Sequence, residues 1–207
     1  MSEEQFIKAL EKVKPGKKVN FDQTIDLIVN LKNFDVKRET FNIFIQLPEK
    51  IKNKKIAGFL EKDSKLIYTI KKDSFPAYKE KKDLKKIVKS YNFFIANAKL
   101  MPAVATTFGR VLGPAGKMPS PQLGVIMSED DETITTLIDK INSTVRIRVK
   151  EPSIKIGIGK ESMGNEKIAS NAFAAYSKIL QTLPRQKDNI RNVKIKLTMG
   201  KPVNVEI

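Results

Sequence analysis

The 207-residue sequence contains no cysteine, no histidine and no tryptophan. Without cysteine the chain forms no disulfide and has no thiolate nucleophile or metal ligand. Without histidine it lacks the commonest general base and the commonest metal-binding side chain. No apolar run approaches the roughly 20 residues of a spanning helix, and the first ten residues lack the apolar core of a secretory signal. We therefore expect a cytoplasmic protein without a metal or cofactor, and an enzyme is disfavoured.

Positive charge is what the sequence has in excess. Lysine and arginine number 39 against 23 acidic residues, which gives a net charge of +16. Such a surface predicts an acidic partner, and nucleic acid comes first because cations placed near phosphates release condensed counterions. An anionic membrane surface is the alternative. The charge is most concentrated in residues 148–207, which hold 12 basic and 5 acidic side chains.

The two ends of the chain share one pattern. Apolar and polar residues alternate there in short segments, which is typical of strands with one solvated face. These segments are residues 24–31, 41–47, 145–150, 154–158, 193–198 and 203–207. Apolar residues at helical spacing predict helices over residues 4–13 and 166–183. The ends therefore predict an antiparallel-type sheet with helices.

The middle of the chain has a different pattern. Short apolar runs at 56–60, 66–70 and 93–96 alternate with a helical stripe over 79–91. This alternation is typical of a parallel, Rossmann-like α/β sheet. Residues 101–124 are rich in Gly and Pro, and residues 108–119 within them are interpreted as a loop.

The predicted fold class is therefore α/β, built as a discontinuous structure. The first domain comprises residues 1–53 plus 148–207 and is α+β. The second comprises residues 54–147 and is inserted into it. Two chain crossings would connect the domains, which is compatible with a hinge.

Lysines recur on the polar faces of the predicted C-terminal strands. Lys155, Lys194 and Lys196 each oppose an apolar face, with no acidic residue between them in the pattern. If these strands pair, the side chains form a ridge with a spacing of about 5 Å that can meet phosphates. The alternative is a solvated strand face that is rich in lysine to prevent aggregation. Three such positions favour nucleic acid.

Two short motifs could contact a ligand directly. Residues 198–202 read Thr-Met-Gly-Lys-Pro and end a strand in a tight turn. A hydroxyl and an exposed methionine there can meet sugar edges and 2′-hydroxyl groups of RNA, although a plain hairpin turn is the commoner reading. Phe21 precedes the first strand and could either fill the core or stack on a nucleotide.

The Gly-rich residues 108–119 do not form a phosphate-binding loop. That motif requires Gly at 111 and Ser or Thr at 118, where this chain has Val111 and Met118. Arg110 and Lys117 could still touch a phosphate backbone.

The four acidic residues 129–132 are interpreted as the start of a helix rather than as a cation site, with Ser128 and Asp131 forming a capping box.

Four segments occur together in an informative combination. They are Leu-Gly-Pro-x-Gly-Lys-Met-Pro at 112–119, Thr-Met-Gly at 198–200, Phe21–Thr24 and Gly159-Lys160. With them the whole chain resembles the large-subunit ribosomal protein L-one family, in its archaeal form. It departs from the bacterial form at Asn20 and Gln23, where Lys and Glu are usual.

The resemblance implies a structural protein of the cytoplasmic ribosome, with a second domain inserted into the first. Its first domain would bind a folded region of large-subunit rRNA at the mobile lateral stalk. The stalk would move with the deacylated tRNA that leaves the exit site. Members also bind their own mRNA and repress its translation, and we expect a monomer outside the ribosome.

The resemblance also assigns residues. Carried over by motif, the principal RNA contacts would be Phe21, Thr24, Thr198, Met199 and Gly200. The strand-face argument adds phosphate contacts at Lys155, Lys160, Lys194, Lys196 and Lys201. Secondary contacts from the inserted domain would be Arg110 and Lys117. The alternatives are a nonspecific nucleic-acid-binding protein and, less favoured, an enzyme that binds a nucleotide in the inserted domain.

Overall fold

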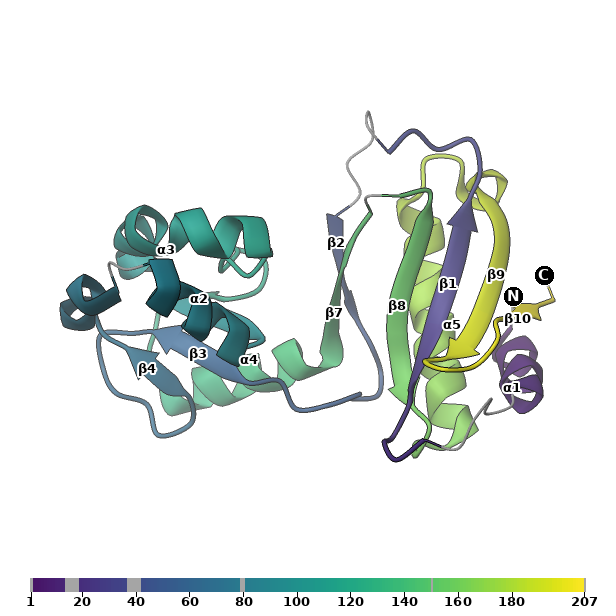
Figure 1. Cartoon of the computed structure of the whole chain (residues 1–207), viewed down its shortest axis with the longest axis horizontal. Coiled ribbons are helices and arrows are strands. Elements are labelled where there is room, and N and C mark those ends of the chain that lie inside the picture. Colours follow the sequence, from purple (N-terminus) through teal and green to yellow (C-terminus); the bar gives the residue numbers. More distant parts are fainter. Residues whose placement is uncertain (1, 14–18, 37–41, 79–80, 150, 207) are drawn as a thin grey trace. The chain divides into compact units, whose positions relative to one another are not determined.

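The computed structural model describes residues 2–13, 19–36, 42–78, 81–149 and 151–206 (Figure 1). The predictions that fall on Phe41, Lys150 and Ile207 lie outside these residues. The α/β fold class is confirmed, because helices accompany antiparallel sheets and a separate parallel sheet. No helix within the described ranges is long and apolar enough to cross a bilayer.

The chain packs as two compact units. We call Met1–Ile51 together with Ser143–Ile207 the terminal unit, and Lys52–Asn142 the inserted unit. The second crossing therefore lies at residues 142 and 143. The expected boundary at 147 and 148 falls inside a strand, Thr144–Arg148, that pairs within the terminal unit.

The main sheet of the terminal unit joins strands from both chain ends. Its order is β10-β9-β1-β8, and every neighbouring pair is antiparallel. The strands are β1 (Thr24–Leu31), β8 (Ser153–Lys160), β9 (Ile190–Leu197) and β10 (Val203–Val205). In β1 every second residue is buried, as the alternation predicts.

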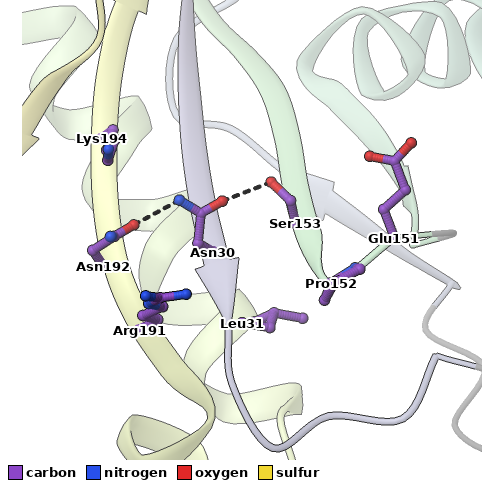
Figure 2. Close-up of a pocket in the computed structure, with 8 residues that line it drawn as sticks. All are labelled: Asn30, Leu31, Glu151, Pro152, Ser153, Arg191, Asn192 and Lys194. Carbon is purple, nitrogen blue, oxygen red and sulfur yellow. Dashed lines mark hydrogen bonds between the residues drawn. The ribbon is translucent and has the colours of Figure 1, made fainter.

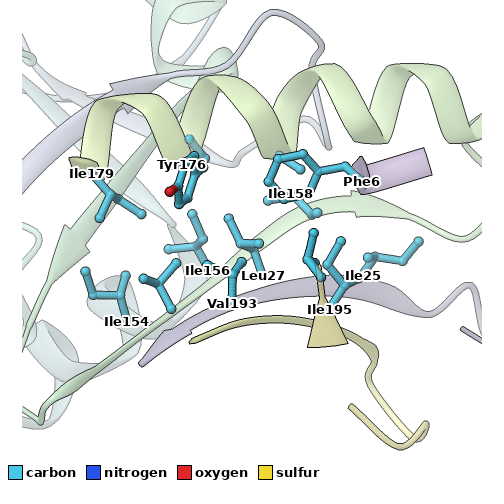
Figure 3. Packing of buried hydrophobic residues seen from close by; sticks show 14 of the residues in the cluster. Phe6, Ile25, Leu27, Ile154, Ile156, Ile158, Tyr176, Ile179, Val193 and Ile195 are labelled. Carbon is cyan, nitrogen blue, oxygen red and sulfur yellow. The ribbon is translucent and has the colours of Figure 1, made fainter. Parts of the chain in front are cut away.

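Two helices cover one face of this sheet. They are α1 (Glu3–Lys12) and α5 (Asn165–Thr182), and a short 3₁₀ helix, η3 (Gln186–Asn189), leads into β9. Figure 3 shows Phe6 of α1 with Tyr176 and Ile179 of α5 facing the buried side chains of β1, β8 and β9. The opposite face of the sheet carries no helix in the described part of the terminal unit, and we call it the open face.

A separate two-stranded ribbon completes the terminal unit. It pairs β2 (Asn42–Gln46) with β7 (Thr144–Arg148) in antiparallel register. Asn171 of α5 fastens the chain that follows β2. Its buried side chain accepts from the Glu49 N–H (2.8 Å) and donates to the carbonyls of Glu49 (3.0 Å) and Ile158 (2.8 Å).

The inserted unit contains a four-stranded parallel sheet of order β4-β3-β5-β6. The strands are β3 (Ile56–Phe59), β4 (Tyr68–Ile70), β5 (Phe93–Asn97) and β6 (Val125–Ile126). The helices are η1 (Lys72–Tyr78), α2 (Lys81–Ser90), η2 (Ala98–Leu100), α3 (Met101–Ala115) and α4 (Asp131–Ser143). Phe59 lies among the rings of Phe75, Phe94 and Phe108 in its core.

The predicted loop at residues 108–119 is wrong for its first part, because α3 (Met101–Ala115) continues through residue 115. Val104, Phe108 and Leu112 recur every four residues and are buried, so packing stabilises the helix despite its glycines. Gly116 ends it in the left-handed conformation, with φ of 67°.

Candidate nucleic-acid interface

Three strand ends meet at one corner of the main sheet. Thr24, the first residue of β1, lies opposite Lys160, the last residue of β8. Its neighbour Ile25 lies opposite Leu197, the last residue of β9. The antiparallel register therefore brings together the predicted contacts near residue 21, residue 160 and residue 198, which are far apart in the sequence.

Thr198 joins the end of β9 to the start of β1. Its hydroxyl donates to the Thr24 carbonyl (3.1 Å) and accepts from the Thr24 N–H (3.2 Å). The Thr198 N–H donates to the same carbonyl at 3.0 Å, and the Gly200 N–H closes the following turn on Leu197 at 3.0 Å. The hydroxyl thus fixes the turn that carries Met199.

Gln23 also lies at this corner, although the sequence pattern did not single it out as a contact. Its side chain is 1% exposed. The amide oxygen accepts from the Met199 N–H (3.1 Å), and the amide nitrogen donates to the Glu161 carboxylate (3.2 Å). A buried amide that bonds to two other segments fixes both of them. Glutamine therefore has a positioning role here.

Asp22 ties the same corner to the chain that follows β8. Its carboxylate accepts from the Ser162 hydroxyl (2.8 Å) and the Ser162 N–H (3.1 Å), and it lies 3.3 Å from the Lys160 ammonium. The hydrogen bond from the Ser162 hydroxyl is the main reason that the pKa of Asp22 lies below its usual value, with Lys160 adding to it. Lys160 is therefore oriented by an acidic partner.

Two large apolar side chains stay exposed on this framework. Phe21 is 53% and Met199 60% exposed, so Phe21 does not fill the core. We call Phe21, Thr24, Thr198, Met199 and Gly200 the terminal patch. Neither exposed side chain fills the core of the terminal unit, and both lie on a backbone held by hydrogen bonds.

The predicted lysines lie on the open face, but not as one ridge. Lys194 and Lys196 alternate with buried residues of β9, and Lys155 does so on β8. β1 lies between these strands, with Ile28 opposite both Lys155 and Lys194. Because neighbouring strands are about 4.8 Å apart, Lys155 and Lys194 are separated by roughly 10 Å of sheet. The expected spacing of about 5 Å is wrong for this pair.

Acidic groups also lie among these lysines, which the strand pattern did not indicate. Asp26 of β1 lies opposite Lys196 in the register. Burial raises the pKa of Asp26 above its usual value, and Lys196 opposes that shift. Lys155 forms an ion pair with Glu151 at 3.1 Å. The open face is therefore basic, but nearby carboxylates neutralise part of the charge of its lysines.

The open face ends in a polar pocket at the far end of β1 from the terminal patch (Figure 2). The Asn30 side chain donates to Asn192 (2.6 Å) and accepts from the Ser153 hydroxyl (2.9 Å), which links three strands. Arg191 and Lys194 line the same pocket, whose volume is about 600 Å³. Glu151 lines the pocket as well, so its charged lining consists of two cations and one carboxylate.

The two secondary candidates in the inserted unit differ in their surroundings. Arg110 is exposed on α3. Lys117 follows α3, and its ammonium donates to the carbonyls of Val88 (2.6 Å) and Tyr91 (2.7 Å) at the end of α2. Burial lowers the pKa of Lys117. This position gives Lys117 a structural role, because it satisfies carbonyls that a helix end leaves open.

We expect Lys117→Met to destabilise the protein by roughly 1–3 kcal/mol, because two helix-end carbonyls lose their donor. Urea unfolding measures the free energy. Lys85→Met, which changes an exposed lysine of α2, is the matched control and should leave stability nearly unchanged. Equal stability of the two variants would contradict the capping role.

The carboxyl edge of the parallel sheet is occupied by the chain itself. Open α/β sheets bind ligands at that edge. Here the Glu129 carboxylate accepts from the N–H groups of Glu61 and Lys62 (both 2.9 Å) and from the Asn97 side chain (2.6 Å). Burial raises the pKa of Glu129, but these hydrogen bonds outweigh it and leave the pKa below its usual value. Donors that could hold a phosphate are thus already used.

The predicted capping box of Ser128 and Asp131 is wrong. α4 begins at Asp131, and the Ser128 hydroxyl donates to the Asp130 carboxylate rather than closing a capping box with Asp131. Glu129 contacts the sheet and not the helix, because the chain crosses the strand ends before α4 begins.

Comparison with known proteins agrees with the paired motifs. Residues 10–201 match the model of the Ribosomal protein L1p/L10e family. The chain belongs to this family. Curated relatives named large ribosomal subunit protein uL1 come from archaea. That of Nanoarchaeum equitans is 35% identical over 95% of this chain and 97% of its own. That of Methanothermococcus thermolithotrophicus is 33% identical over all of both chains. That of Thermofilum pendens is 36% identical over 93% of this chain and 88% of its own.

Membership in the L1p/L10e family confirms the resemblance inferred from the motifs. The protein is a structural, non-enzymatic component of the large ribosomal subunit and belongs to the translation machinery of the cytoplasm. The interpretation of the inserted unit as an enzyme is thereby set aside.

Proposed function

We propose that the terminal unit binds a folded region of large-subunit rRNA at the lateral stalk, through the terminal patch and the adjoining open face. The observation that carries this proposal is the exposure of Phe21 and Met199 on a corner fixed by hydrogen bonds between three strand ends. RNA offers a wide, shallow minor groove with sugar edges and 2′-hydroxyl groups, which such a patch can contact.

The lysines and the terminal patch would have different roles in binding RNA. Lys194, Lys196 and Lys201 would contact phosphates and supply affinity that does not depend on sequence. The terminal patch would recognise the shape of the RNA. Because Thr198 and Gln23 already hold the turn in place, binding would order few additional groups, which lowers its entropic cost.

We expect Thr198→Val to weaken binding of a stalk rRNA fragment by roughly 1–3 kcal/mol, since the hydroxyl that fixes the turn is lost while the side-chain shape is kept. Gel-shift or anisotropy titration at fixed salt measures the change.

Thr182→Val is the matched control, because Thr182 is an exposed threonine at the end of α5 whose hydroxyl donates to the Lys178 carbonyl at 2.8 Å. It should bind like the unchanged protein. If both folded variants bind equally well, the patch is not the contact surface.

A nonspecific nucleic-acid-binding protein remains the alternative to test. Charge alone would let duplex DNA compete with rRNA at equal phosphate concentration. Under our proposal, excess duplex DNA or a same-length unrelated RNA fails to displace the stalk fragment. Complete displacement by either competitor would support the nonspecific reading.

On the family resemblance we also propose that the chain assists release of tRNA from the exit site and represses translation of its own mRNA, and that it is monomeric off the ribosome. If the messenger imitates the rRNA site, both RNAs use the terminal patch. Thr198→Val should then weaken both complexes to the same extent, whereas unchanged binding of the messenger would assign it a different surface.

A further inference from the structure

A second pair of exposed apolar side chains lies on the inserted unit. Leu66 and Tyr68 are each 49% exposed. Both line a hollow of about 530 Å³ beside the start of β3 and β4, and its remaining apolar wall comes from Ile56, Ile67 and Ile138. The hollow therefore lies at the amino ends of the strands, at the opposite edge from Glu129. Apolar side chains left open around a concave site indicate a ligand.

The aromatic part of this hollow consists of two stacked tyrosine rings. The ring of Tyr68 stacks on that of Tyr91, with centroids 5.4 Å apart and planes inclined by 19°. Tyr91 meets Phe94 edge to face at 6.2 Å, and its carbonyl accepts from Lys117. The Tyr91 ring thus contacts Phe94 while its backbone carbonyl is held by Lys117, and Tyr68 is the more exposed member of the pair. Such a pair provides a platform for another planar ring.

The rim of the hollow is cationic. Lys54, Lys55 and Lys65 line it, and no acidic residue of the described chain does. The Lys54 ammonium donates to the Ile141 carbonyl at 2.6 Å, and burial, with Lys52 adding to it, lowers the pKa of Lys54 to about 8. Lys55 and Lys65 are exposed. Cations beside an exposed aromatic ring match a nucleotide, whose phosphate is anionic and whose base is planar.

We propose that this hollow binds an unpaired nucleotide of single-stranded RNA, with its base stacked on Tyr68 and its phosphates beside Lys55 and Lys65. Proteins bind single strands by combining aromatic platforms with a basic groove, because every base has a π face. The site is separate from the terminal patch, and the inference does not depend on the function proposed for that patch. An acidic protein segment would use the lysines but would leave the stacked tyrosines without a role.

The test uses the intact protein labelled only at its tyrosines, of which there are four. An unstructured hexanucleotide RNA is titrated in while the ring signals are followed by NMR. We expect the signals of Tyr68 and Tyr91 to shift together. Tyr176, which is 3% exposed in the core of the terminal unit, is the internal control and should not move. Tyr68 and Tyr91 signals that stay fixed at saturating RNA would overturn the proposal.

Two substitutions separate stacking from charge. In Tyr68→Leu the affinity read from the Tyr91 signal should fall roughly 5–100-fold, because one base loses its aromatic platform, while Tyr68→Phe should bind like the unchanged protein. Unaltered affinity of Tyr68→Leu would contradict base stacking. An abasic ribose-phosphate hexamer or an acidic peptide that shifts Tyr91 with equal affinity would also overturn it. Thr198→Val should leave these titrations unchanged, so failure at one site is distinguished from failure at the other.

Discussion

Raising monovalent salt from about 50 to 200 mM should weaken the complex with a stalk rRNA fragment by roughly 10²–10⁴-fold, if five to eight phosphates are contacted. Each phosphate neutralised by a lysine releases nearly one condensed cation, so the logarithm of affinity falls linearly with the logarithm of salt concentration. Isotherms at four or more salt concentrations measure the slope. A slope near zero would mean that the lysines of the open face contribute nothing to binding.

One lysine can be assigned by its effect on that slope. Lys194→Gln should reduce the slope by about one and weaken binding to all RNAs similarly. Lys178→Gln is the matched control, since Lys178 is exposed on α5, which covers the other face of the sheet. If both variants lower the slope equally, the contact surface is not the open face.

Phe59→Ala should destabilise the inserted unit by about 3–5 kcal/mol, as the loss of a fully buried aromatic ring does. Phe59 is 0% exposed, and its centroid lies 4.8 Å from that of Phe108, 5.8 Å from Phe94 and 5.9 Å from Phe75. Urea unfolding with limited proteolysis of residues 52–142 measures this loss. Because the proposed rRNA surface shares no partner with Phe59, rRNA affinity should change by less than about two-fold.

Phe6→Ala is the corresponding change in the terminal unit, where Phe6 is also 0% exposed and packs beside Tyr176. Phe6→Ala should lower the stability by about as much as Phe59→Ala does. Unlike Phe59→Ala, it should also abolish rRNA binding, because the terminal unit that carries the proposed interface unfolds. Loss of rRNA binding in Phe59→Ala while the terminal unit stays folded would show that the inserted unit contributes to the interface.

Periodicity predicted the elements well, because burial repeats differently in strands and helices. Residues 24–31 alternate in the sequence and form β1 over the same span. α3 was missed since its glycines and prolines suggest a loop, whereas the burial of Val104, Phe108 and Leu112 stabilises a helix. Propensity is a local quantity and is overridden when a helix can bury an apolar face.

The composition and the short motifs were sufficient to indicate a basic, RNA-associated protein and its family, because charge and motif spacing are properties of the chain alone. Composition and motifs could not predict the strand order, because that order depends on hydrogen bonds between segments more than 100 residues apart. That order placed β1 between Lys155 and Lys194, set Asp26 against Lys196, and buried Gln23 beneath Met199. Which polar groups meet at a surface is thus decided by register, and register is a property of the packed sheet.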